Sequence, residues 1–100
     1  MARARPQAIN LTEAAAKRVQ ELLTEAMENR EALMEAEDVE AVEALTSRAV
    51  AAAVACLADL TAAFAQEDLE AADRLTTRLR YWRKLGEEAR AKRRRLDQIA

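Results

Sequence analysis

Residues that could take part in recognition follow one predicted helix at a regular spacing. Four residues at a step of four form a ridge that begins apolar and ends in carboxylates: Leu23, Met27, Glu31 and Glu35. Thr24 and Glu28 lie beside this ridge. Residues four apart lie on one face of a helix, so this ridge is a candidate docking surface for another protein. The same spacing also fits a wide core stripe that continues into a solvated acidic face, and the pattern alone favours that interpretation.

Two neighbouring aromatic residues, Tyr81 and Trp82, must point in different directions if their segment is helical. A helix turns once in about 3.6 residues, so the two rings lie about 100° apart. Trp82 falls on the apolar row of the last predicted helix and is expected to be in the core. Tyr81 lies on the flank of that helix, where an amphipathic ring can meet a partner.

Side chains suited to catalysis are scarce. The sequence contains no His, one Cys (Cys56) and one Gly (Gly86). It therefore lacks the commonest general base and metal ligand, a thiolate cluster and a Gly-rich phosphate loop. We expect a non-enzymatic protein that uses no cofactor and no metal, with Cys56 as a buried thiol.

Charge is unevenly distributed, although the formal net charge is only −2. Residues 21–43 hold nine acids and one base, and residues 83–95 hold seven bases and two acids. Both blocks fit solvated helix faces, with cations near a helix C-terminus, and the acidic block also fits a partner-binding surface. Aromatic residues do not interleave with the basic end, and no stretch is apolar and continuous enough to predict a membrane span. We therefore expect neither nucleic acid nor a membrane as partner.

The composition predicts an all-α fold, an antiparallel three-helix bundle with long helices. Ala, Glu, Leu and Arg dominate, and the chain has one Gly and one Pro. Caps and apolar spacing predict helices over about 11–36, 39–65 and 69–97, with Asn10, Asp38 and Asp68 as N-caps. Residues 1–9 are expected to form a flexible tail and residues 10–100 a single domain.

The apolar rows of the second and third helices indicate how these helices pack. The second row is Val42, Leu45, Ala49, Ala53, Cys56, Leu60 and Phe64, and the third is Ala72, Leu75, Leu79, Trp82, Gly86, Ala89 and Leu96. Gly86 is unusual inside a helix, where it costs up to about 1 kcal/mol relative to Ala. A close helix crossing beside Trp82, or a mild kink, would explain it.

Two segments carry a likeness to a known family. Residues 27–37 read MENREALMEAE, and residues 62–92 read AAFAQEDLEAADRLTTRLRYWRKLGEEARAK, in which LRYWRKL is the most specific part. They resemble the C-terminal domain of HscB-type co-chaperones, the J-proteins of iron–sulfur cluster biogenesis. The resemblance covers roughly residues 20–96 and is weakest in the Ala-rich middle.

The resemblance implies a three-helix bundle that binds the cluster scaffold protein IscU or its mitochondrial equivalent. In that family, apolar residues and carboxylates of the first helix form the binding surface together with one aromatic residue of the last. Carried over residue by residue, these contacts fall on Leu23, Met27, Glu28, Glu31, Glu35 and Tyr81, with Thr24 where the family often has a second apolar contact.

One feature departs from a full HscB protein. The sequence has no His, and so no His-Pro-Asp motif of a J-domain, and we do not expect it to stimulate an Hsp70. The resemblance implies a location in the cytoplasm or the mitochondrial matrix. The alternative is an engineered helical bundle with the same fold. Such a bundle would bind a new protein target, or self-associate as a homo-oligomer through its Ala-rich second helix. Its cell compartment would be unknown.

Overall fold

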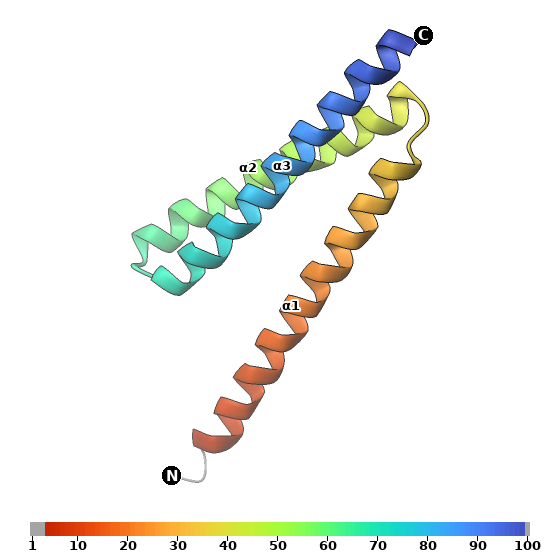
Figure 1. The fold of residues 1–100 in the computed structure, drawn as a ribbon. Coiled ribbons are helices and arrows are strands. Elements are labelled where there is room, and N and C mark those ends of the chain that lie inside the picture. Colours follow the sequence, from red (N-terminus) through yellow and green to blue (C-terminus); the bar gives the residue numbers. More distant parts are fainter. Residues whose placement is uncertain (1–3, 100) are drawn as a thin grey trace. The chain divides into compact units, whose positions relative to one another are not determined.

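The computed structural model describes residues 4–99, and these residues form three helices (Figure 1). They are α1 (Ala4–Glu35), α2 (Val39–Ala65) and α3 (Leu69–Ile99). Between residues 4 and 99 there is no strand, so the predicted all-α class is confirmed. The chain divides into two compact units, one that ends at Met34 and one that begins at Glu35.

The first helix begins earlier than the capping pattern predicts. α1 starts at Ala4, so residues 4–9 are helical and the expected tail is wrong for this segment. Pro6 lies in the first turn, where backbone N–H groups have no partner within the helix, so proline is tolerated there. Asn10 is inside α1 and is therefore not its N-cap. The remainder of the expected tail, residues 1–3, lies outside the described residues.

Aspartate caps begin the other two helices, at the positions that the sequence indicates. Asp38 Oδ1 accepts a hydrogen bond of 2.8 Å from the backbone N–H of Ala41, and the extended backbone of Asp38 (φ −131, ψ 164) is typical of an N-cap. Asp68 Oδ1 accepts one of 3.1 Å from Ala71 N–H. Each cap satisfies one N–H group at the start of the helix that follows, which fixes where α2 and α3 begin.

The turn between α2 and α3 is a Schellman motif without glycine. The N–H of Asp68 donates to the carbonyl of Ala63 at 2.9 Å, and the N–H of Glu67 donates to the carbonyl of Phe64 at 3.1 Å. Glu67 occupies the left-handed position of the motif, with φ 56. Three residues thus reverse the chain direction, and α3 runs back antiparallel to α2 (Figure 1).

The α2–α3 hairpin has its own core, which is built from small and medium side chains. The buried apolar residues of the two helices are Val42, Leu45, Ala49, Cys56, Ala63, Ala72, Leu79, Trp82, Leu85 and Ala89. Ala residues at the contact let the helix backbones come close together. The predicted rows are confirmed at most of these positions, including Trp82 and the buried thiol of Cys56. Leu85 is an additional core residue that the row omitted.

One predicted core residue, Phe64, is in fact 58% exposed. It lies in the last turn of α2, and the neighbouring Ala63 takes the buried position instead. The Schellman hydrogen bonds fix the end of α2 with Ala63 inward, so the ring of Phe64 is turned outward. The apolar spacing predicts the wrong residue here, because the turn that follows a helix also decides which side chain of the last helical turn faces the core.

Gly86 is buried at the α2–α3 crossing, as the sequence predicts. A Cβ atom placed on Gly86 would lie 3.7 Å from the Cβ of Ala49, which is an ordinary van der Waals contact. The two helices are therefore close at this point, yet a methyl group would still fit. Two small residues, Gly86 and Ala49, face one another at the crossing, and Gly86 could be replaced by alanine.

By length and composition alone, α2 could cross a membrane, with a mean hydropathy of 1.6 over its most apolar window. The sequence predicts no such span, because the Ala-rich run at residues 49–60 is weakly hydrophobic and carries Asp59. A window that extends beyond this run gains further apolar residues, such as Leu45 before it or Phe64 after it. A mostly buried core helix of a water-soluble domain meets the same criterion. In α2 only 17% of this window is buried, although one side of the helix packs along α3.

Candidate functional site

The ridge of α1 carries its two apolar members on the surface. Leu23 is 60% exposed and Met27 is 65% exposed. They are four residues apart on one uninterrupted helix, so their side chains cover adjacent patches of one face. Large apolar side chains at this exposure are what a docking surface requires, because covering them removes apolar surface from water.

Met34 continues this apolar strip and was not predicted from the ridge spacing. It is 75% exposed and follows Met27 by seven residues, which is about two helical turns. Positions four apart rotate slowly around the helix, so this spacing leads from Met27 to Glu31 and Glu35. Positions seven apart lie nearly on the same face, so this spacing leads from Met27 to Met34. A search at the heptad spacing would have found Met34 from the sequence.

The carboxylates lie beside the apolar strip on the same helix. Glu28, Glu31 and Glu35 are all exposed, and Glu35 is the last residue of α1. Their spacings of three and four place like charges on neighbouring positions, and each such pair destabilises a helix by about 0.2–0.5 kcal/mol. A cationic partner would relieve this repulsion, so the helix is electrostatically suited to a basic surface.

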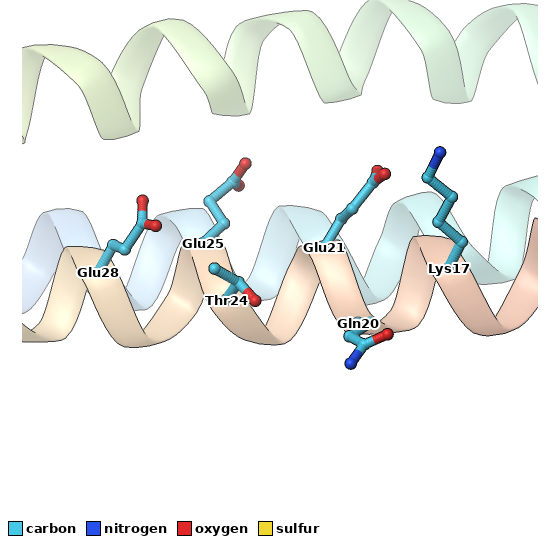
Figure 2. Close-up of a pocket in the computed structure, with 6 residues that line it drawn as sticks. All are labelled: Lys17, Gln20, Glu21, Thr24, Glu25 and Glu28. Carbon is cyan, nitrogen blue, oxygen red and sulfur yellow. The ribbon is translucent and has the colours of Figure 1, made fainter.

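A shallow hollow on α1 extends the acidic surface towards the N-terminus. Six residues of this one helix line it: Lys17, Gln20, Glu21, Thr24, Glu25 and Glu28. Figure 2 shows the long side chains of Lys17, Glu21, Glu25 and Glu28 projecting to the same side of α1. Thr24 and Glu28 were predicted as site residues, and Glu21 and Glu25 were recognised only as part of the acidic block. The surface is thus an acidic face with an apolar edge.

Tyr81, the remaining predicted residue, belongs to α3 in the other compact unit. Its ring is half-buried and packs edge to face on Trp82, with ring centroids 4.9 Å apart. Trp82 is 5% exposed, so the two neighbours have the different environments that the helical phase predicts. The structure brings the six α1 residues together on one helix and describes Tyr81 within the α2–α3 hairpin.

The basic end of α3 is tied to α2 by an ion pair. Arg93 Nη2 lies 3.1 Å from Glu43 Oε1, and Arg93 Nε lies 3.9 Å from Asp97 Oδ2. All three side chains are about half exposed, so these pairs contribute little to stability, of the order of 0–1 kcal/mol each. Arg93 thus takes part in local pairing near the end of α3.

The described residues contain no group of three or more His, Cys, Asp or Glu side chains placed to hold a metal ion. The acidic side chains of α1 are spread along one side of a helix, and a chelating site needs ligands that converge on one point.

Comparison with known families gives one match. The model described as the HSCB C-terminal oligomerisation domain matches residues 18–90. No curated protein and no solved structure matches the chain significantly. The matched span covers the acidic face of α1, all of α2 and most of α3, including Tyr81. Nothing in the comparisons supports the alternative of an engineered bundle.

Proposed function

Because the chain belongs to the family of the HSCB C-terminal oligomerisation domain, we propose that it is a binding module for the scaffold protein on which iron–sulfur clusters are assembled, IscU or its mitochondrial equivalent. The family is one of co-chaperone domains and not of enzymes, which agrees with the absence of His from the sequence. The observation that carries the proposal is the exposure of Leu23 and Met27 beside the carboxylates of α1.

The apolar residues act as anchors. Leu23 and Met27 each have more than half of their surface in water, and burying a side chain of this size contributes about 1.5–3 kcal/mol. Met is unbranched and adapts to the shape of a partner's groove. Thr24, between them in sequence, offers a smaller contact than the second apolar residue common in the family, so the apolar part of the surface is reduced.

The carboxylates of Glu28, Glu31 and Glu35 supply charge complementarity. Exposed charges around an apolar centre mainly raise the association rate and exclude partners of the wrong charge. We therefore expect the scaffold to present basic side chains beside an apolar groove. Tyr81 adds an aromatic ring with a polar tip, held in its orientation by the edge-to-face contact with Trp82.

Titration calorimetry of the chain with an IscU-type scaffold tests the proposal. Single variants Leu23→Ala, Met27→Ala and Tyr81→Ala are each expected to weaken binding by about 5–30-fold, the range of interface anchors. Leu69→Ala is the matched control, because Leu69 is a 72% exposed apolar residue outside the proposed surface. Circular dichroism verifies that helicity is unchanged. Absence of binding heat with the folded wild-type chain would exclude this function.

The cell compartment follows from the partner. If the scaffold is the ligand, the chain works where clusters are assembled, in the cytoplasm of a bacterium or in the mitochondrial matrix. Stimulation of an Hsp70 is not part of the proposal, because the sequence has no His-Pro-Asp motif. An ATPase assay with the Hsp70, in the presence and absence of the chain, tests that expectation.

A further inference from the structure

Met34 is the most exposed of the large apolar side chains among the described residues, and the scaffold proposal does not use it. It is 75% exposed, compared with 60% for Leu23 and 65% for Met27. All three belong to α1, and Met34 is the last residue but one of this helix. Covering a side chain of this exposure removes a large apolar area from water. Met34 therefore has the property that makes Leu23 and Met27 candidate anchors.

Helical phase places Met34 on the same narrow strip of α1 as these two residues. At about 100° per residue, Met27 lies about 40° around the helix from Leu23, and Met34 lies about 20° from Leu23, between the two. Helix α1 is continuous over this segment, so the phase is kept from the first of them to the last. We call Leu23, Met27 and Met34 the apolar strip of α1. From residue 23 to residue 34 it extends about 17 Å along the helix axis.

The carboxylates of the proposed surface all lie on one side of the apolar strip. Glu28, Glu31 and Glu35 fall about 80–140° around the helix from Leu23, in the same sense of rotation as Met27 and Met34. Along the axis, Glu31 comes before Met34 and Glu35 comes directly after it. A partner that contacts Leu23 at one end and Glu35 at the other must therefore extend past the level of Met34.

Arg30, the one base among the acids of residues 21–43, borders the apolar strip on its other side. It is exposed, lies between Met27 and Met34 along the axis, and falls about 20° from Leu23 in the opposite sense of rotation. The stem of an Arg side chain is apolar and can lie along apolar surface while the guanidinium stays in water. Arg30 is thus compatible with a continuous apolar contact from Met27 to Met34.

We propose that Met34 is a third apolar anchor for the scaffold protein, and that the scaffold contact continues along α1 to the last turn of the helix. This inference rests on the proposed function, which names the scaffold as the partner. It requires an apolar groove on the scaffold at least about 17 Å long, with basic side chains along one edge to face the carboxylates. Met is unbranched and polarisable, so Met34 can adapt to the end of such a groove.

Titration calorimetry of the full chain with an IscU-type scaffold tests the role of Met34. Met34→Gln keeps the length of the side chain but makes it polar, and it is expected to weaken binding by about 5–30-fold. Met34→Leu keeps an apolar side chain of similar volume and is expected to stay within about twofold of wild type. Leu69→Gln is the matched control, because Leu69 is 72% exposed and begins α3, in the other compact unit.

The titrations separate this inference from the function on which it rests. If Leu23→Ala weakens binding and Met34→Gln does not, Met34 is not an anchor, and the scaffold proposal stands without it. If the folded wild-type chain gives no binding heat, both are excluded. If Leu69→Gln weakens binding as much as Met34→Gln does, the loss does not arise from the apolar strip, and the inference on Met34 is overturned.

Nuclear magnetic resonance of methionine methyl groups measures directly which side chains the scaffold covers. The chain is labelled with ¹³C at the methionine methyl carbon, and Met27→Leu and Met34→Leu chains assign the two signals. A soluble nitroxide broadens the signals of methyl groups that it can reach. Excess scaffold is expected to protect both Met27 and Met34 from this broadening. Protection of Met27 alone would overturn the inference, because the contact then ends before the last turn of α1.

Discussion

The ring of Tyr81 meets the ring of Trp82 edge to face, with planes at 68° and centroids 4.9 Å apart. One ring of the pair is buried in the α2–α3 core, and the other is half-buried on the flank of the same helix. The buried indole is thus a platform that orients the phenol. Adjacent residues in the sequence thus differ in environment: the ring of Trp82 is buried in the hairpin core, and the ring of Tyr81 is half-buried.

We predict that Trp82→Ala destabilises the hairpin far more than Tyr81→Ala. Truncating a buried tryptophan removes its contacts and leaves a cavity, which costs about 3–5 kcal/mol. Tyr81→Ala removes a partly exposed contact and the aromatic pair with Trp82, and an aromatic pair contributes about 0.5–1.5 kcal/mol to stability. Urea unfolding followed by circular dichroism measures both. Equal losses for the two variants would contradict the division of roles between the rings.

We predict that Gly86→Ala raises the stability of the hairpin by about 0.5–1 kcal/mol, the difference in helix propensity between the two residues. The added methyl group reaches ordinary contact distance from the Cβ of Ala49, so it fits without displacing α2. Thermal unfolding measures the gain. Gly86→Leu is the contrasting variant, because its longer side chain overfills this crossing and is expected to cost about 1–3 kcal/mol.

Replacing Glu67 with glycine is also expected to stabilise the protein, by about 1 kcal/mol. Glu67 holds a left-handed backbone conformation with φ 56, which costs a residue with a Cβ about 1–2 kcal/mol. Glycine relieves this strain and leaves both Schellman hydrogen bonds in place, although it adds freedom to the unfolded chain. Denaturant unfolding gives the difference. Glu70→Gly, inside the first turn of α3, is the control and should destabilise.

If the chain binds the scaffold through α1, the association should depend strongly on salt. Raising ionic strength screens the attraction between the exposed carboxylates and a basic partner, so the association rate falls while dissociation changes little. Stopped-flow binding measurements over a salt series test this. Glu28→Gln and Glu31→Gln together should reduce the slope, whereas Glu70→Gln, an acid of similar exposure on α3, should not.

Much of the hairpin could be predicted from the sequence, because local chemistry decides its ends. Asp38 and Asp68 each cap the helix that follows, and Val39–Ala65 is the range that the caps and apolar spacing predict. Trp82 was assigned to the core by helical phase alone. These features depend on residues within one or two turns of each other, which is the range over which sequence patterns are informative.

The features that the sequence did not predict depend on more than one capping or spacing pattern. The start of α1 lies before the capping pattern at Asn10, because the first turn of a helix tolerates Pro6. Phe64 was placed in the core because periodicity was extended through a helix end that the turn reorients. Met34 was missed because a ridge with a step of four drifts around the helix, whereas a step of seven follows the apolar strip.

The three-residue reversal at Asp68 has a consequence for how the hairpin folds. Contacts between α2 and α3 begin beside this bend, with Ala63 and Ala72, and continue outward in order towards Ala49 and Gly86. Each new contact therefore closes only a slightly larger loop than the one before it, and no step requires distant segments to find one another. Such a structure can close like a zipper from the bend, and the hairpin should fold on the fast timescale of proteins with mostly local contacts.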